Sequence, residues 1–167
     1  MIALKNILVA TDFGDASDAA WTYGRALART FGATLHVLHV TEDVSLNSFA
    51  TEAYAASIPG LQREVDEEAR KKLDALIADN DACGPSARAI VLSSTAPALA
   101  IVECAKDRAI DLIVVGTHGR GALAHLMMGS VAERVVRLAP CPVLTVRHPE
   151  HEFVYPDALM VRTAHAE

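Results

Sequence analysis

Three glycines and a serine recur at fixed spacing in the second half of the chain, and together they could hold a phosphate. They are Gly116, Gly119, Gly129 and Ser130. Glycine permits turns with positive φ and lets main-chain N–H groups approach a ligand closely, because it has no Cβ. A helix N-terminus adds unpaired N–H groups and the positive end of the helix dipole. These residues therefore favour anion binding at the start of a helix.

The flanking residues supply the elements that this chemistry needs. Leu112–Val115 is a short apolar run, typical of a strand buried on both faces, and Gly116 ends it. Ser130 and Glu133 form the S-x-x-E pattern of a capping box, which predicts that the Ser130 side chain caps a helix beginning there. The predicted order is strand, glycine-rich loop and helix N-terminus.

Two common phosphate-binding motifs fit this stretch only in part. Gly116 to Gly121 has the glycine spacing of a P-loop, but Ala122-Leu123 stands where the motif requires Lys-Ser/Thr. Gly119–Ala124 matches the G-x-G-x-x-A fingerprint of dinucleotide-binding folds. However, no helix start follows it directly, and no acidic residue lies about 20 residues further on to hold a ribose. Neither motif is favoured.

The spacing that does fit is Gly116-x2-Gly119-x9-Gly129-Ser130. It resembles the nucleotide-binding signature G-x2-G-x9-G-S/T of the universal stress protein family, and the resemblance extends from about residue 5 to 146. It implies the ATP-binding subclass of that family, with ATP as the ligand and magnesium as its companion. The alternative is that the glycines only shape a tight crossover and that Ser130 only caps its helix.

The rest of the chain reads as alternating strands and helices. The expected strands are Asn6–Ala10, Thr34–Val40, Ala87–Leu92, Leu112–Val115 and Pro142–Val146. This alternation implies an α/β fold with a parallel sheet and helices on both faces. The resemblance adds the detail: a single open five-stranded, Rossmann-like sheet in the order 3-2-1-4-5.

Apolar residues with a 3.6-residue period mark the faces of three helices before the one at Ser130. The expected faces are Ala20, Tyr23, Gly24, Leu27, Ala28 and Phe31; then Val65, Ala69, Leu73, Leu76 and Ile77; then Ala98, Ile101, Val102 and Ala105. Asp15 or Ser17 is expected to cap the first helix, and Gly32 to end it. Residues 41–60 are expected to form a loop with a helical turn near 50–56, and Pro59-Gly60 to punctuate it.

The candidate site lies where two strands end. In open parallel sheets, ligands bind beyond the carboxyl ends of the strands, where the strand order reverses. In the implied order this point lies between the first and fourth strands, which end near Asp12 and Gly116. The polar residue after one strand and the glycine-rich loop after the other therefore converge on the same crevice.

The resemblance implies a role for each matching residue. Ala10, Thr11 and Asp12 follow the first strand, and Asp12 faces the ribose, with magnesium as an open alternative. Val40 holds adenine through its backbone. The ribose and α-phosphate are wrapped by Val115, Gly116, Thr117, His118 and Gly119. The β- and γ-phosphates meet Gly129, Ser130 and Val131, with Arg120 as a mobile cation nearby. Asp12 has an alternative role beside the helix cap, and His118 has one as an exposed loop residue.

Two positions depart from the family pattern. Thr95 stands where the family usually has glycine, so the loop after the third strand is expected to approach the site differently. Gly14 replaces a common serine, which removes one capping hydroxyl after the first strand. Neither position belongs to the glycine signature.

Composition limits the class of protein. The 167 residues suit one domain, expected at residues 1–147, with a tail at 148–167. A net charge of −6 without a Lys/Arg cluster disfavours nucleic acid and anionic membranes as partners. No apolar run reaches the 18 or so residues of a membrane span, and no signal peptide is expected. Three cysteines without a C-x-x-C pair fit a reducing cytoplasm and argue against a zinc site.

Catalytic groups are sparse around the candidate site. Phosphoryl transfer needs charge neutralisation and a positioned nucleophile, yet the stretch has no P-loop lysine and no obvious second carboxylate. The sequence thus favours an ATP-dependent regulatory or stress-survival module with an unidentified protein partner. A slow ATP-hydrolysing switch and a structural stress dimer without nucleotide stay open. The resemblance also implies a homodimer through the last strand. The tail lies beyond the resemblance; its apolar residues are expected to pack across the partner subunit, with packing on the same chain as the open alternative.

Overall fold

A parallel sheet of five strands in the order β3-β2-β1-β4-β5 forms the centre of the computed structural model, which describes residues 2–44, 58–78, 87–117 and 128–148. The strands are β1 (Asn6–Ala10), β2 (Thr34–Thr41), β3 (Ala87–Ser93), β4 (Leu112–Gly116) and β5 (Val143–Val146). The helices are α1 (Asp15–Phe31), α3 (Ile58–Ala78), α4 (Pro97–Asp107) and α5 (Ser130–Leu138). The predicted fold class, strand order and five strands are confirmed, each strand within one residue at either end.

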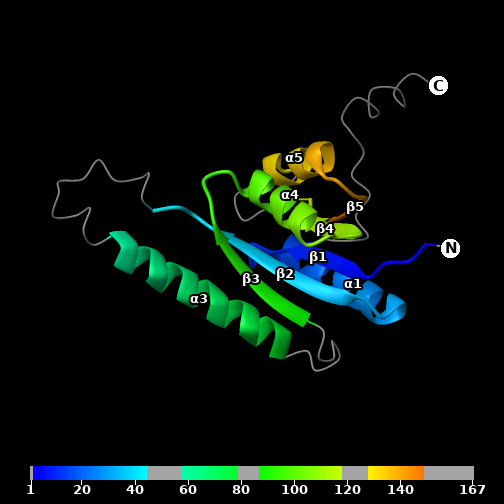
Figure 1. Ribbon diagram of the computed structural model, residues 1–167, viewed down its shortest axis with the longest axis horizontal. Coiled ribbons are helices and arrows are strands. Elements are labelled where there is room, and N and C mark those ends of the chain that lie inside the picture. The colour runs from blue at the N-terminus through cyan, green and yellow to red at the C-terminus, as the bar shows by residue number, and fades with distance from the viewer. Residues whose placement is uncertain (1, 45–57, 79–86, 118–127, 149–167) are drawn as a thin grey trace, which may run out of the picture.

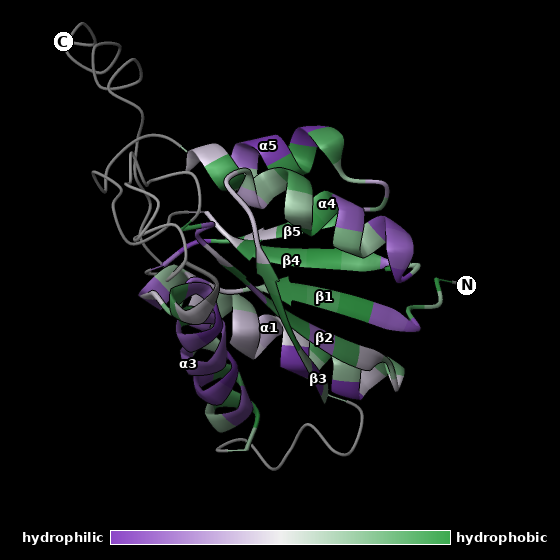
Figure 2. Cartoon of the chain, turned by 60° about the vertical axis from the view of Figure 1, so that its left-hand side comes forward, coloured by the Kyte–Doolittle hydropathy of each residue, from purple (hydrophilic) through white to green (hydrophobic). Residues whose placement is uncertain are grey.

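Helices cover both faces of the sheet (Figure 1): α4 and α5 lie on one face, and α1 and α3 on the other. Side chains of β1 alternate between these two layers, as the two-residue period of a strand requires. Ile7 and Val9 pack with α1, whereas Leu8 packs with α4 and α5, and all three are fully buried. Figure 2 shows β1 and β4 apolar over most of their length. Their position between two helical layers explains the continuous apolar runs in the sequence.

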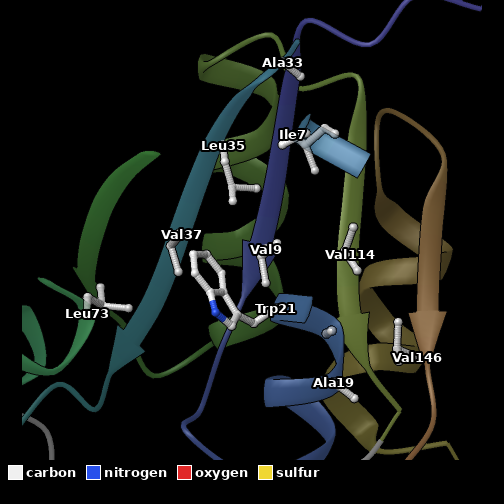
Figure 3. Close-up of a cluster of buried hydrophobic side chains, with 12 residues drawn as sticks. Ile7, Val9, Ala19, Trp21, Ala33, Leu35, Val37, Leu73, Val114 and Val146 are labelled. Carbon is white, nitrogen blue, oxygen red and sulfur yellow. The ribbon is translucent and has the colours of Figure 1, made fainter. Parts of the chain in front are cut away.

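The buried face of α1 differs from the predicted one. Trp21, which was not predicted, is 4 % exposed and lies beside Val9 and Val37 (Figure 3). Tyr23 and Phe31 were expected to be buried but are 42 % and 43 % exposed. The buried stripe is set by residue 24, a glycine, where an added Cβ would lie 2.2 Å from a methyl group of Val9. Tyr23 is turned about 100° from that line of contact, and Phe31 is the last residue of the helix.

Helix α3 begins earlier than expected, because Pro59 and Gly60 lie inside its first turn instead of in a loop. Proline is tolerated there, since the first N–H groups of a helix have no intrahelical partner. The predicted apolar face is confirmed at its centre, where Ala69 and Leu73 are buried. The helical turn expected near residues 50–56 lies outside the described residues.

Polar contacts tie α3 to the ends of β2 and β3. The Oδ1 atom of Asp66 accepts hydrogen bonds from Thr41 Oγ1 at 2.7 Å, from Gln62 Nε2 at 3.0 Å and from Ser93 Oγ at 3.0 Å. Thr41 is 4 % exposed, so this carboxylate satisfies a buried hydroxyl. In the part of the chain that the structure describes, no helix is both long and apolar enough to cross a membrane.

Candidate functional site

The turn between β1 and α1 is held by side chains of its own residues. Thr11 Oγ1 lies 3.0 Å from Ser17 Oγ and accepts the Phe13 N–H at 3.0 Å. The Gly14 N–H donates to Asp12 Oδ1 and to Ser17 Oγ, both at 3.1 Å. Ser17 Oγ in turn donates to the Gly14 carbonyl at 2.8 Å. The turn is therefore pre-organised with Asp12 at its centre.

Gly14 is the N-cap of α1 and carries no hydroxyl. The hydroxyl that a serine would supply at this position comes from Ser17, three residues further on. Ser17 supplies the expected capping contact, whereas Asp15 is the first helical residue and only adds negative charge to the first turn. Phe13 has φ 61°, in the left-handed region. Such a conformation costs a non-glycine residue on the order of 1 kcal/mol and persists only where neighbouring contacts hold it.

At the end of β4, Gly116 is required by packing. A Cβ there would lie 2.7 Å from the backbone carbon and oxygen of Ala16, in the first turn of α1. The fourth strand and the first helix thus approach each other at a point where only glycine fits. Gly116 is half-buried and also lines the cavity described below. Its lack of a side chain therefore has a structural reason in addition to any contact with a ligand.

The two ends of the glycine-rich loop are joined to each other and to the sheet. The Thr117 N–H donates to the Val146 carbonyl at 2.8 Å, which extends the pairing of β4 with β5. The Gly129 N–H donates to the Thr117 carbonyl at 2.6 Å. His118, Gly119 and Arg120 lie outside the described residues, so their predicted contacts remain predictions.

The capping box predicted for α5 is wrong. Gly129 is the N-cap, with φ −60° and ψ 146°, and no side chain among the described residues caps the helix by a hydrogen bond. The helical bonding starts there because the Gly129 carbonyl accepts the Glu133 N–H at 2.9 Å. Glu133 instead lies 3.4 Å from Arg137 one turn further on. Ser130 is thus the first helical residue and is exposed, so its hydroxyl does not serve as the cap.

The first turn of α5 consequently presents backbone donors. The first four N–H groups of a helix have no intrahelical partner. The Gly129 N–H is used by Thr117, which leaves those of Ser130, Val131 and Ala132 at the positive end of the helix dipole. All three residues line the same cavity. The arrangement suits an anion.

Ten of the thirteen candidate residues line one cavity of about 530 Å³ at the carboxyl ends of the strands. These ten are Ala10, Thr11, Asp12, Val40, Val115, Gly116, Thr117, Gly129, Ser130 and Val131. The other three lie outside the described residues. The structure therefore brings together residues from the ends of β1, β2 and β4 and the start of α5, at the point where the strand order reverses.

Six further residues line this cavity that were not predicted to do so: Ser17, Leu38, His39, Pro97, Ile101 and Ala132. Two of them were within reach of the sequence pattern, since Leu38 shares a strand face with Val40 and Ala132 follows Val131 in the same helical turn. Pro97 and Ile101 come from α4 and supply an apolar wall. Nothing local in the sequence indicated that wall, because α4 reaches the site only through its packing on the sheet.

Charge in the cavity is one-sided. Among the described residues that line it, Asp12 carries the carboxylate and there is no lysine or arginine. Any anion in the described part of the site would thus be held by backbone N–H groups and the helix dipole. The carboxylate lies in the turn after β1 and the donors lie at the start of α5, so the two ends of the cavity favour opposite ligand chemistry.

Comparison with known proteins shows that this chain is similar in sequence and in structure to members of one protein family. The model of the universal stress protein family matches residues 3–147. A universal stress protein of Methanocaldococcus jannaschii is 34 % identical over 148 residues, which cover 89 % of this chain and 85 % of that protein. The solved structure of universal stress protein UspA from Lactobacillus plantarum has a TM-score of 0.72 at 30 % identity, covering 88 % of this chain and 100 % of that one.

Similar solved structures include nucleotide complexes. One is a universal stress protein in complex with cAMP, with a TM-score of 0.54 and 27 % identity, and the match covers 87 % of this chain and 98 % of that one.

Proposed function

The chain belongs to the universal stress protein family, and from this premise we propose that it binds ATP and acts as a nucleotide-dependent regulatory or stress-survival module. One observation carries the proposal: the cavity at the strand reversal is lined both by an acidic turn and by three helix N–H groups that have no intrahelical partner. A nucleotide has the matching polarity, with hydroxyl donors on its ribose and negative charge on its phosphates.

The size and lining of the cavity support a ligand of this kind. Small-molecule sites commonly measure roughly 300–1,000 Å³ and combine apolar walls with a few placed polar groups. The cavity of about 530 Å³ lies in this range, and Pro97, Ile101 and Val115 make part of it apolar. The cAMP complex of a related protein supports an adenine nucleotide as the ligand class.

Each part of ATP has a proposed partner. Asp12 accepts hydrogen bonds from the ribose, and the backbone of Val40 holds the adenine edge. The N–H groups at Ser130 and Val131, with the Ser130 hydroxyl, hold the β- and γ-phosphates. Thr117, His118 and Gly119 surround the ribose and α-phosphate, and Arg120 adds a cation. Magnesium accompanies the phosphates, with Asp12 as the carboxylate of the described lining.

We propose binding, not rapid turnover, as the activity. Phosphoryl-transfer enzymes use cations to neutralise the developing charge and a base or a positioned water as the nucleophile. The described lining offers backbone donors and one carboxylate for these tasks. Bound ATP would then favour one conformation or one partnership of the protein. Slow hydrolysis would reset it.

We further propose a homodimer through β5. This strand is the last in the sheet order, and Val143, Leu144 and Thr145 are only half-buried. An open apolar edge invites pairing with another chain, and pairing with its own copy gives a closed, two-fold interface. The tail at residues 148–167, most of which lies outside the described residues, would pack at this interface. We place the protein in the cytoplasm, where Cys104 and Cys141, which are unpaired, would stay reduced.

The test is nucleotide carried through purification. Protein purified without added nucleotide is denatured, and the released small molecules are identified by mass spectrometry. Calorimetry on stripped protein then compares ATP, GTP and cAMP. The proposal expects ATP as the released nucleotide and as the tightest ligand. Stripped, folded protein that binds none of the three at millimolar concentration would contradict it.

A further inference from the structure

The backbone N–H and C=O of Val40 face the side of β2 on which β1 lies, but the pairing of β1 with β2 ends before it reaches Val40. The Leu38 carbonyl accepts the Thr11 N–H at 2.9 Å, whereas the Thr41 carbonyl accepts the Ser94 N–H on the opposite side at 3.0 Å. Backbone groups of alternate residues in a strand point to the same side, so the N–H and C=O of Val40 face the β1 side, as those of Leu38 do. The β1–β2 register stops at Ala10.

The next rung of a parallel ladder would join the Val40 N–H to the Thr11 carbonyl. That carbonyl instead lies 2.7 Å from Nδ1 of His39. A carbonyl oxygen only accepts hydrogen bonds, so Nδ1 of His39 must carry the proton. The side chain of His39 thus binds the Thr11 carbonyl, which would otherwise accept the N–H of the neighbouring Val40 and extend the β1–β2 ladder.

The imidazole of His39 also contacts an aromatic side chain. Its ring lies on the Phe13 ring, with centroids 4.5 Å apart and planes at 40°. Phe13 is the residue with φ 61°, and its N–H donates to Thr11 Oγ1. His39 is half-buried and lines the cavity together with Thr11 and Val40. His39, near the end of β2, is therefore connected through these contacts to the turn after β1, beside the candidate site.

We propose that His39 is a positioning residue for the nucleobase. By binding the Thr11 carbonyl, it ends the β1–β2 ladder before Val40 and keeps the N–H and C=O of Val40 turned to the cavity. The same bond fixes the turn that carries Asp12. It therefore also fixes the distance between Val40, which contacts the base, and Asp12, which contacts the ribose. This inference rests on the proposed nucleotide function and goes beyond it by naming the side chain that determines base selectivity.

The selectivity follows from the pattern of donors and acceptors. A backbone N–H and C=O on one strand edge complement a base that presents an acceptor beside a donor. On the edge that carries N7, adenine presents a ring-nitrogen acceptor beside its N6 amino donor, whereas guanine presents two acceptors, N7 and O6. The edge that His39 exposes at Val40 therefore favours adenine over guanine.

The test compares two substitutions at this one position. His39→Leu removes the donor, whereas His39→Asn keeps an amide N–H near the position of Nδ1. Calorimetry measures the dissociation constants of ATP and GTP for both variants and the unmodified protein. We expect His39→Leu to weaken ATP binding by about tenfold, the size of one lost hydrogen bond, and to reduce the preference for ATP over GTP. His39→Asn should stay within about threefold of the unmodified protein.

The outcomes separate the two proposals. Unmodified protein that binds no nucleotide overturns the proposed function and this inference with it. Unmodified protein that prefers ATP, together with a His39→Leu variant of unchanged preference, overturns this inference alone. A loss of ATP and GTP affinity by the same factor in both variants also overturns it, because that pattern reports general disruption of the turn.

A second measurement does not depend on the variants folding. Nitrogen-15 NMR of the unmodified protein, with labelled histidine and at mildly alkaline pH, distinguishes the two neutral tautomers of His39. The inference expects the Nδ1–H form, the less common one for free histidine. Assignment of His39 as the Nε2–H form would show that the ring does not donate to Thr11.

Discussion

The N–H of Gly129 donates to the carbonyl oxygen of Thr117, with 2.6 Å between nitrogen and oxygen. This bond joins the start of α5 to the end of β4, and the Thr117 N–H continues the connection to Val146 on β5. The end of β4 and the start of α5 therefore meet at this bond. The first-turn donors of α5 are thus tied to the sheet through Thr117.

We predict that Gly129→Val abolishes ATP binding while the fold persists. Its φ of −60° and ψ of 146° are open to any residue, so valine brings no backbone strain. Its side chain should however enter the space next to the first-turn N–H groups, which have no intrahelical partner. Calorimetry should detect no ATP binding, and circular dichroism should remain that of an α/β protein. Gly32→Ala is the matched control. With φ 64° at residue 32, it should lower stability by about 1 kcal/mol and leave ATP affinity unchanged.

Gly116→Ala should destabilise the protein and weaken binding together. Its Cβ would meet the Ala16 backbone at 2.7 Å, and backbone cannot move aside without displacing the first turn of α1. We expect a loss of about 1–3 kcal/mol in the free energy of unfolding, as for overpacking elsewhere. Urea denaturation measures it. Unchanged stability would mean that α1 and β4 do not approach as closely as the structure has them.

Asp12→Asn should reduce ATP affinity with little change in stability. An asparagine oxygen can still accept the Gly14 N–H that Asp12 Oδ1 accepts, so the turn is kept while the carboxylate charge is lost. Turnover by the unmodified protein should lie far below the range of about 1–10³ s⁻¹ that enzymes typically show. A phosphate-release assay checks this. A magnesium-dependent rate above about 1 s⁻¹ that disappears in Asp12→Asn would instead identify a true ATPase.

The stability of the protein should fall as the medium becomes acidic, through His36. Burial lowers the pKa of His36 from its ordinary value of 6.5, and the charges of Arg108 and Arg88 lower it further. Below pH 6.5 the unfolded chain therefore takes up a proton that the folded chain refuses, and stability is lost until the pH reaches the lowered folded pKa. Thermal melts from about pH 8 to pH 5 measure this slope.

The matched variants are His36→Gln and His148→Gln. The first removes the buried titrating group but keeps an amide nitrogen that can reach Asn6 Oδ1, 3.4 Å from His36 Nε2, so the acid loss should shrink. The second removes an exposed histidine and should leave the slope as it is. Equal slopes in all three proteins would assign the acid loss to other groups.

Thr145→Pro should convert the proposed dimer into a folded monomer. The carbonyls of Pro142 and Val146 both accept bonds from the β4 side, so the Thr145 N–H, at the alternate position, points to the open edge. Proline removes that donor without breaking the β4–β5 ladder. Light scattering at micromolar concentration measures the mass. Leu144→Lys should also give monomers, although Leu144 packs partly against the core and its loss would reduce stability as well.

The sequence by itself determined the strands, their order of appearance and most of the residues that line the candidate site. A strand buried on both faces leaves a continuous apolar run, so Asn6–Ala10 and the run after Asp111 were readable locally. Gly32 marked the end of α1 because a left-handed cap has few alternatives to glycine. Asp12 and Gly116 were predicted to lie in one crevice because parallel strands bring their carboxyl ends to the same edge. The strand order itself was implied by the family resemblance.

Only the tertiary structure decided which backbone groups are left open at that edge. His39 bonds to Thr11, 28 positions away in the sequence, and Pro97 and Ile101 enter the site from a helix with no motif of its own. Ser130 looked like a cap, yet the cap is Gly129. The reason is common to all of these: a hydrogen bond or a close packing contact depends on distances between elements, and residue type and spacing determine only the elements. Gly116 shows this most plainly, because its need for hydrogen in place of a side chain exists only once the backbone of Ala16 lies 2.7 Å from where a Cβ would stand.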